Sequence, residues 1–229
     1  MSSRKPTGQL SRAQLAWRAA QEIRDGSYVN LGIGIPEMAA RFVPAGRFVT
    51  YQSENGILGF GEAPPEGEED FDLVNAGKRP VTAVPGTCYF DHATSFAMIR
   101  GGHIDLAIMG AFQVAANGDL ANWKAGDDAV PAVGGAMDLV CGAKRVHILM
   151  SHCTNTGEPK LVERCSYPLT GAAVVSKVFT DLAVIDIVER RFVVREIVPG
   201  LTFDELQALT AARLHVEADV LPLAAPGLE

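Results

Sequence analysis

Residues 28–36 read Tyr28-Val29-Asn30-Leu31-Gly32-Ile33-Gly34-Ile35-Pro36, and this stretch indicates how the chain is built. Its first four residues predict a short strand that runs into a glycine turn. Pro36 then suits the first turn of a helix over residues 36–42, because that position needs no backbone N–H. A second strand is predicted over residues 47–52. Strand, turn, helix and strand in this order predict an α/β fold.

The rest of the chain continues this alternation of helices and strands. Ser11 can cap a helix over residues 11–24. Thr202 and Glu205 stand at capping-box spacing and predict a closing helix over residues 202–212. We expect one open α/β domain spanning residues 1–229, with a largely parallel sheet covered by helices. The other predicted elements are a helix over residues 94–99 and strands over residues 81–84, 105–109, 146–150, 182–187 and 192–197.

Composition and charge narrow the class of protein. The chain has 229 residues, of which 48% are hydrophobic and 21% charged, an ordinary balance for a globular protein. Its net charge of −7 argues against a nucleic-acid-binding protein, which usually presents a basic face. No apolar run approaches the ~18 residues of a membrane helix. Because no apolar run follows the basic start either, we expect no secretory signal and a cytoplasmic location.

The cysteines and histidines predict no metal site. The four cysteines lack CxxC spacing, and we expect them to be small buried apolar residues in a reducing compartment. The five histidines form no recognisable ligand set. His152 and Cys153 could in principle share a metal ion, but sequence neighbours seldom converge on one ion, so structural histidines are the better interpretation.

Gly32 and Gly34 follow a strand, as the glycines of a dinucleotide-binding fingerprint do. The third glycine of that fingerprint is missing, because Glu37 occupies its position and Pro36 precedes it. The pattern therefore disfavours a nicotinamide site. Two glycines after a strand still allow the backbone to approach a ligand or a neighbouring helix closely.

The turn Ser53-Glu54-Asn55-Gly56 places a carboxylate at the C-terminal end of a strand, where open α/β sheets bind ligands. Asn-Gly is strong turn chemistry, so Glu54 is expected on a tight bend. Two further segments could hold an anion through backbone amides or a cation, Asn75-Ala76-Gly77-Lys78 and Val133-Gly134-Gly135-Ala136-Met137. Taken singly, each motif is better explained as an ordinary loop or helix boundary. Together they favour a functional site.

These blocks together resemble the B subunits of the two-subunit 3-oxoacid CoA-transferases, over nearly the whole chain. The block at residues 53–56 matches the signature of that family around its catalytic glutamate. The resemblance is also carried by the stretch at residues 28–36 and by Ile57-Leu58-Gly59, Asn75-Ala76-Gly77-Lys78, Ser95-Phe96-Ala97-Met98-Ile99-Arg100-Gly101-Gly102-His103, Gly118-Asp119-Leu120-Ala121-Asn122-Trp123, Gly134-Gly135-Ala136-Met137-Asp138-Leu139-Val140 and Pro168-Leu169-Thr170-Gly171.

The resemblance implies a fold, a chemistry and a partner. The fold is the CoA-transferase type, which is similar to that of the sugar-phosphate isomerases. Glu54 is implied to form a covalent glutamyl-CoA thioester, with backbone donors from Gly135 and Ala136 near the thioester. CoA contacts are implied for Asn30, Lys78 and Gly134. The resemblance further implies CoA esters and small carboxylic acids as substrates, no permanently bound cofactor, and an A subunit in a heterodimer or an α2β2 heterotetramer.

Within the family, the chain looks closer to the 3-oxoadipate branch than to the acetoacetate branch. The evidence is Gly110-Ala111-Phe112-Gln113-Val114 and the run over residues 127–133. Acetoacetate enzymes usually carry Ile-Pro-Gly-Lys after the tryptophan, whereas Lys124-Ala125-Gly126-Asp127 follows Trp123 here. The sequence thus predicts CoA transfer from succinyl-CoA to 3-oxoadipate. The alternatives are an acetoacetate enzyme, a hydrolase or isomerase in which the carboxylate acts as general base, and a regulatory acyl-CoA-binding subunit.

Overall fold

The structure, a computed structural model, describes residues 8–126 and 132–228. Its helices are α1 (Arg12–Ala20), α2 (Ile35–Met38), the 3-10 helix η1 (Ala39–Phe42), α3 (His92–Arg100), α4 (Ala136–Gly142) and α5 (Phe203–Ala208). Its strands are β1 (Tyr28–Leu31), β2 (Thr50–Ser53), β3 (Ile57–Phe60), β4 (Ala83–Tyr89), β5 (Leu106–Met109), β6 (Gln113–Ala115), β7 (Leu120–Ala121), β8 (Val146–Met150), β9 (Leu161–Val162), β10 (Lys177–Thr180), β11 (Ala183–Val188), β12 (Arg191–Ile197), β13 (Leu214–His215) and β14 (Leu221–Pro222).

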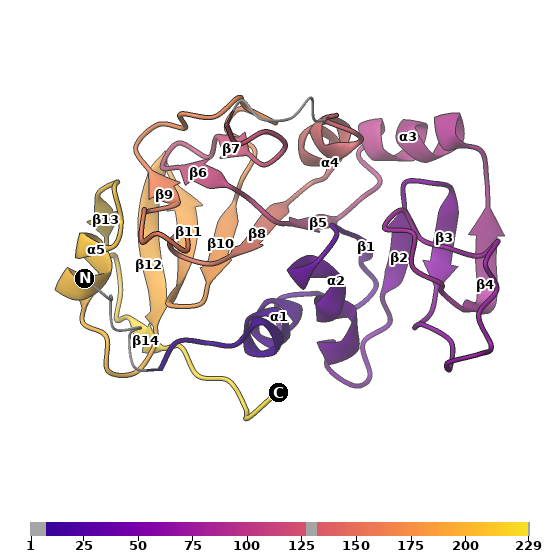
Figure 1. Cartoon of the computed structure of the whole chain (residues 1–229), viewed down its shortest axis with the longest axis horizontal. Coiled ribbons are helices and arrows are strands. Elements are labelled where there is room, and N and C mark those ends of the chain that lie inside the picture. The colour runs from indigo at the N-terminus through magenta and orange to yellow at the C-terminus, as the bar shows by residue number, and fades with distance from the viewer. Residues whose placement is uncertain (1–7, 127–131, 229) are drawn as a thin grey trace.

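The large sheet is parallel at its centre, has antiparallel pairs on either side of it, and ends with β13 and β14 parallel to β12. It runs in the order β13-β12-β11-β10-β8-β5-β1-β2-β3-β4, and β14 also pairs with β12 (Figure 1). The neighbours from β10 to β2 are parallel, whereas β11 and β3 pair antiparallel with both of their neighbours. Every residue of β5 and β8 is buried, as expected for parallel strands covered on both faces. The predicted open α/β sheet is confirmed.

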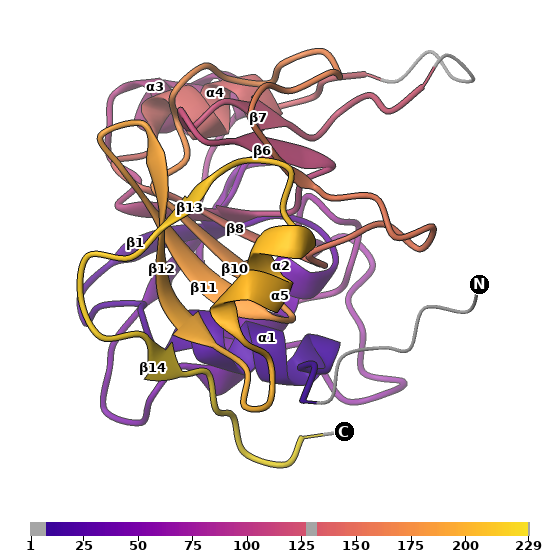
Figure 2. The ribbon, with the colours of Figure 1, turned by 90° about the vertical axis from the view of Figure 1, so that its left-hand side faces the viewer.

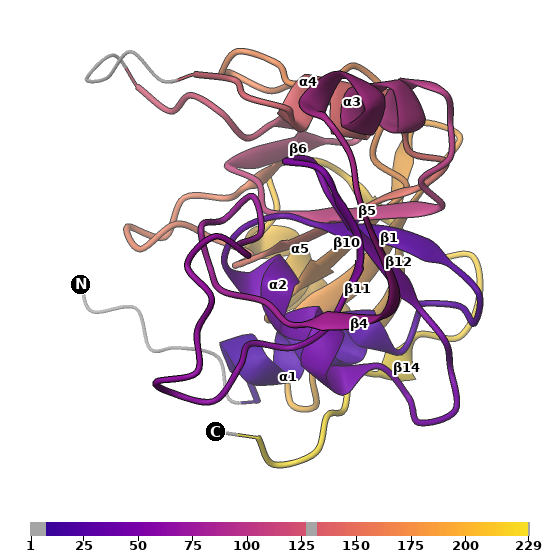
Figure 3. The same ribbon diagram turned by 90° about the vertical axis from the view of Figure 1, so that its right-hand side faces the viewer.

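Helices cover both faces of this sheet. Figures 2 and 3 show α3 and α4 on one side of the sheet and α1 and α2 on the other. The side of α3 and α4 also carries a small second sheet of order β7-β6-β9. No helix among residues 8–126 and 132–228 is long and apolar enough to cross a membrane.

Several predicted elements have the expected position and caps. β1 and β8 begin and end at the predicted residues. The Ser11 hydroxyl accepts a hydrogen bond from the Gln14 N–H at 3.2 Å, which confirms the cap of α1. This helix ends at Ala20, earlier than predicted, because the next turn tightens and Ile23 N–H donates to Ala20 O at 3.1 Å. The capping box at the start of α5 is also present.

Other elements differ from the sequence-based expectation. Residues 81–84 predict a short strand, but β4 extends over Ala83–Tyr89 and includes Pro85 and Gly86. Such residues normally end a strand; they are tolerated here because β4 is the edge strand of the sheet. The short strands β3, β6, β7, β9, β10, β13 and β14 were not predicted, since runs of two to four residues carry little periodicity.

The expectation that all cysteines are buried is wrong. Cys88 and Cys141 are exposed, and Cys153 and Cys165 are half-buried, all four as free thiols. Cys88 lies on the edge strand β4, and Cys141 lies on α4, where only some positions face the core. Composition alone cannot distinguish such positions from core ones.

A buried polar cluster joins β8, β10 and the end of α5. The His152 ring lies with Nδ1 3.0 Å from the Thr180 hydroxyl and Nε2 2.9 Å from the Thr210 hydroxyl. Its backbone N–H donates to Asp181 Oδ1 at 2.7 Å. Burial lowers the pKa of His152 to about 4, against the smaller opposing effect of Asp181. His152 is therefore a structural histidine that is neutral in the folded chain.

We predict that this histidine makes the stability of the chain depend on pH. Its pKa is about 4 in the folded chain, below the ordinary value of 6.5, so between these values the unfolded state binds more protons and the free energy of unfolding rises with pH. The stabilisation that His152 contributes is complete above pH ~6.5. By pH ~5, about 2 kcal/mol of the free energy of unfolding is lost.

Urea unfolding of the wild type and of His152→Gln at pH 7.5 and pH 5 would measure this contribution. Glutamine retains a donor and an acceptor but does not titrate, so the variant should lose less stability between the two pH values. Equal losses in the two proteins would contradict the assignment.

Candidate active site

Glu54 lies on a hairpin turn between β2 and β3, whose backbone geometry requires glycine. Gly56 N–H donates to Ser53 O at 3.0 Å, and Phe90 N–H donates to Gly56 O at 3.0 Å. Gly56 has φ +115°, and a Cβ built there would lie 2.1 Å from Phe90 O. The tight bend predicted from Asn55-Gly56 is therefore confirmed, and it fixes Glu54 at the C-terminal end of β2.

The Glu54 carboxylate is half-buried and is directed toward the neighbouring strand β1. Asn30 Nδ2 donates to Glu54 Oε2 at 3.2 Å. Asn30 aligns with Gln52 in the parallel β1–β2 ladder, so its side chain emerges beside the end of β2. The Asn30 side chain is buried, and its Oδ1 has no hydrogen-bond partner among the described residues. Buried acceptors without a partner are uncommon in folded proteins, so this oxygen is an unusual feature beside Glu54.

The segment at residues 74–79 packs against the same turn. Ala76 N–H donates to Ser53 Oγ at 2.8 Å, and Asn55 Nδ2 donates to Val74 O at 2.7 Å. Lys78 has the left-handed φ of +61°, and its side chain is exposed. The segment predicted to hold an anion thus lies beside the Glu54 turn, with the Lys78 ammonium open to approach.

Gly135 forms a wall of the site beside the Glu54 side chain. A Cβ built on Gly135 would lie 3.9 Å from Glu54 Cγ and 2.8 Å from Phe96 Cζ. Gly134, with φ +56°, makes the preceding bend, and Ala136 N–H lies 3.4 Å from Val133 O. Gly135 therefore lies directly beside the Glu54 side chain, whereas Gly134 and Ala136 are the chain neighbours of Gly135. The part of the predicted branch motif at residues 127–131 lies outside the described residues.

A cavity of about 370 Å3 opens beside Gly135, between α3 and α4. Its basic group Arg100 donates to Asp138 Oδ1 at 2.6 Å, and this hydrogen bond raises the pKa of the guanidinium. The His92 ring packs against Phe96 with centroids 4.5 Å apart. The cavity is lined by His92, Ala93, Phe96, Arg100, Gly134, Gly135 and Asp138.

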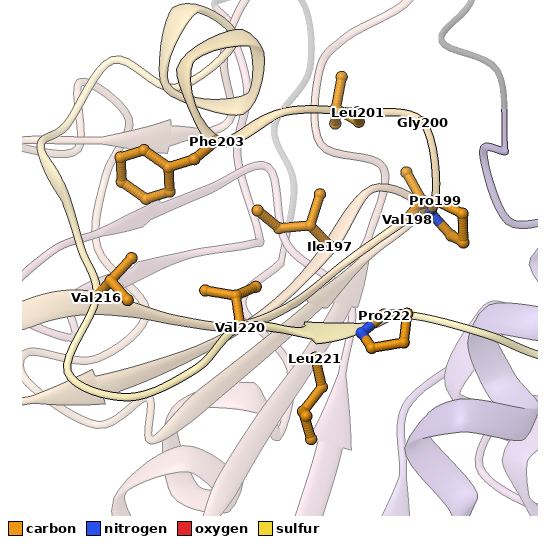
Figure 4. A pocket seen from close by; sticks show the side chains of 10 residues that line it. All are labelled: Ile197, Val198, Pro199, Gly200, Leu201, Phe203, Val216, Val220, Leu221 and Pro222. Carbon is orange, nitrogen blue, oxygen red and sulfur yellow. The ribbon is translucent and has the colours of Figure 1, made fainter.

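A groove of similar size at the other end of the sheet has a different character. Figure 4 shows it between the end of β12, the start of α5 and β14. Its lining contains no ionisable side chain, so it offers no group for acid–base or nucleophilic chemistry. The lining residues are Ile197, Val198, Pro199, Gly200, Leu201, Phe203, Val216, Val220, Leu221 and Pro222.

The glycines at residues 32 and 34 have separate roles. A Cβ built on Gly32 would lie 3.3 Å from Ile108 O, so the close neighbour is the strand β5 rather than a helix. Gly34 has φ +95° and open space around it. Among the residues that the structure describes, no group of three His, Cys, Asp or Glu side chains could hold a metal ion.

Two residues of the site were missed by the sequence analysis. Gln52 and Ser95 are buried, and the Gln52 side chain forms hydrogen bonds with Asn30 and with Ser95. A glutamine and a serine at otherwise buried positions of a strand and a helix are the signal that could have identified them.

Comparison with known proteins identifies the family of this chain. The family model described as coenzyme A transferase matches residues 12–209. The B subunit of the 3-oxoadipate CoA-transferase from Acinetobacter baylyi is 55% identical over 90% of this chain and 95% of its own length. The B subunit of the succinyl-CoA:3-ketoacid coenzyme A transferase from Helicobacter pylori is 50% identical over 87% of this chain and 96% of its own.

The fold also matches a solved structure. An acyl-CoA transferase from Escherichia coli O157:H7 superposes with a TM-score of 0.73 at 18% identity, over 93% of this chain. This chain spans 43% of the length of that enzyme. Fold, family model and relatives together define an α/β transferase acting on CoA esters. The chain belongs to the coenzyme A transferase family.

We predict that Gly56→Ala disrupts the turn that carries Glu54. The added methyl group would collide with Phe90 O and strain a left-handed backbone, so we expect a loss of about 3 kcal/mol in the free energy of unfolding. Gly67→Ala is the matched control, because Gly67 has φ +87° and nothing within 4 Å of an added Cβ. Chemical unfolding of both variants would reject this interpretation of the turn if their losses were equal.

Proposed function

We propose that this chain is the B subunit of a CoA-transferase that moves CoA from succinyl-CoA to 3-oxoadipate through a covalent thioester on Glu54. The substrate assignment is supported by the 3-oxoadipate relative and by the sequence blocks at residues 110–114 and 127–133. The observation that carries the proposal is the position of Glu54. Its half-buried carboxylate contacts Asn30 and lies beside Gly135 at the ligand-binding edge of the sheet.

The first half of the reaction forms the thioester. The Glu54 carboxylate attacks the carbonyl carbon of the acyl-CoA and a C–O bond forms. The C–S bond then breaks, which releases CoA as thiolate and leaves a mixed acyl-glutamyl anhydride on Glu54. The thiolate then attacks the glutamyl carbonyl and releases the first acid as its carboxylate. The covalent route divides one difficult exchange into smaller steps.

The second half reverses these steps with another acid. The carboxylate of 3-oxoadipate attacks the glutamyl thioester and displaces CoA thiolate, which leaves a second mixed anhydride. The thiolate attacks the acyl carbonyl of the incoming acid, forms its CoA ester and returns Glu54 as carboxylate. No net proton or electron is consumed, so the residues need only position groups, stabilise oxyanions and exclude water.

Each predicted contact residue has a definite task in this chemistry. The backbones of Gly135 and Ala136 are the proposed donors for the tetrahedral oxyanions, where one donor contributes about 3–4 kcal/mol in comparable sites. Asn30, whose amide donates to Glu54 Oε2, is proposed to contact CoA beside the nucleophile. Lys78 is exposed and is proposed, with Gly134, to contact CoA, where a compact cation can meet an anionic group.

The proposal includes an A subunit that completes the site. The relatives that match nearly the full length of this chain are named as B subunits, and the longer acyl-CoA transferase is more than twice its length. We propose a heterodimer or an α2β2 heterotetramer, in which the A subunit supplies the remaining contacts to the acids and closes the site against water.

An acetoacetate-specific enzyme is the second candidate, because the Helicobacter pylori relative is only slightly less similar than the 3-oxoadipate one. The cation that would bind the distal carboxylate of 3-oxoadipate separates the two candidates. Arg100 is the basic residue at the cavity beside Gly135, although Asp138 already binds it.

We predict that Glu54→Gln abolishes transfer, by at least about 10³-fold in kcat, because the amide is not a nucleophile. Incubation of the wild-type complex with succinyl-CoA should raise the intact mass of this chain by that of CoA less water, and borohydride should then inactivate it. Neither effect is expected for Glu54→Gln.

Glu66→Gln is the matched control, because Glu66 is exposed in the segment between β3 and β4, and this variant should retain the mass increase and the activity. A hydrolase that uses Glu54 as general base would consume acyl-CoA without the adduct. A binding subunit would retain acyl-CoA in both proteins without turnover. Either outcome would reject the transferase.

The acceptor can be tested with succinyl-CoA and either 3-oxoadipate or acetoacetate. We predict a kcat/KM at least about tenfold higher for 3-oxoadipate, since a distal carboxylate that meets a cation adds roughly 1.5–3 kcal/mol. Comparable values for the two acids would refute the branch assignment and leave the CoA-transferase chemistry intact.

A further inference from the structure

A chain of buried side chains leads from α3 to the Glu54 carboxylate. Ser95 on α3 and Gln52 on β2 are 0% and 2% exposed. Gln52 Nε2 donates to Ser95 Oγ at 2.8 Å, and Asn30 Nδ2 donates to Gln52 Oε1 at 2.7 Å. The same Asn30 nitrogen donates to Glu54 Oε2 at 3.2 Å. Three side-chain contacts therefore connect a helix to the proposed nucleophile.

The orientation of both amides follows from a backbone carbonyl. Gln52 O lies 3.0 Å from Asn30 Nδ2 and can only accept, so the NH2 group of Asn30 must be on that side. Gln52 must then present Oε1 to Asn30, because its NH2 group would oppose another donor. Its Nε2 is left facing Ser95. Each amide thus has a single orientation that is consistent with its neighbours, and the two hydrogens of the Asn30 NH2 group are shared among three acceptors.

We propose that Gln52 and Ser95 are positioning residues that fix the Asn30 amide and, through it, the place from which Glu54 attacks. This inference rests on the proposed function. The two bonds from Asn30 to Gln52, at 3.0 and 2.7 Å, are shorter than its bond to Glu54. Asn30 is thus held mainly by Gln52, while the carboxylate is directed by a weaker contact that it can leave during the reaction.

The helix α3 also links this chain of contacts to Gly135. Phe96, next to Ser95, packs against Gly135, which also lies beside Glu54. Ser95 therefore sets the position of the carboxylate relative to α3, and Phe96 sets the position of the glycine wall relative to the same helix. Because reacting groups must be placed within a fraction of an ångström, a shift of α3 against β2 alters the attack geometry.

The test uses Ser95→Ala in the complex of this chain with its A subunit. The variant removes the acceptor of Gln52 Nε2, and we expect kcat and the rate of thioester formation to fall about tenfold, with KM values within about twofold of wild type. Ser176→Ala is the matched control, since its hydroxyl donates to Val146 O at 2.9 Å outside the site. It should lose comparable stability and no activity.

Gln52→Glu provides a readout that a purely structural role would not change. A carboxylate can still accept from Asn30 and from the Ser95 hydroxyl, so the contacts persist. It adds a negative charge near Glu54, and like charges disfavour the ionised nucleophile. The acid limb of the kcat/KM profile should therefore move to higher pH than in wild type.

The outcomes separate the two proposals. A tenfold loss for Ser95→Ala with normal Ser176→Ala activity, together with the shifted profile of Gln52→Glu, supports the positioning pair. Wild-type kcat in Ser95→Ala, or an unchanged pH profile in Gln52→Glu, overturns it while the thioester on Glu54 stands. A wild-type complex that forms no thioester with succinyl-CoA overturns both the positioning pair and the proposed function.

Discussion

The parallel pairing of β1 with β2 is the constraint on which the site depends. The ladder aligns Asn30 with Gln52, and both side chains are buried. Because side chains alternate between the faces of a strand, a slip of one residue would turn either of them to the other face. The carboxylate of Glu54 would then lose its contact with β1. The register of these two short strands therefore decides whether the carboxylate has a hydrogen-bond donor on β1.

The site combines a rigid base with an open side. Toward the sheet, Glu54 accepts a hydrogen bond from the buried amide of Asn30. It also lies on a turn whose geometry requires glycine at position 56. On the other side lie the exposed Lys78 and the cavity between α3 and α4. Groups that react must be placed firmly, whereas groups that enter and leave need access. The two requirements are met by different elements, the strands for the first and the loops and helices for the second.

The sequence predicts the central sheet and the turn of Glu54 because these features are local. β1 and β8 are apolar runs bounded by turn residues, and the caps of α1 and α5 are spelled out within four residues. The contacts of Gln52 with Asn30 and Ser95 join residues distant in sequence, and no periodicity reports them. The strand β4 was misplaced for a related reason, since its tolerance of Pro85 depends on its place at the sheet edge.

The cavity beside Gly135 has a consequence for how such proteins diverge. Arg100, one of its two charged lining residues with Asp138, is largely exposed, so its replacement removes little of the packing of the core. The side-chain amides of Asn30 and Gln52 are buried, and substitution of either residue would leave polar atoms without partners. Substitutions at the rim of the cavity can therefore change which acid binds, while the buried groups beside Glu54 stay the same. Proteins built in this way can change the acids that they use while they keep the same reaction mechanism.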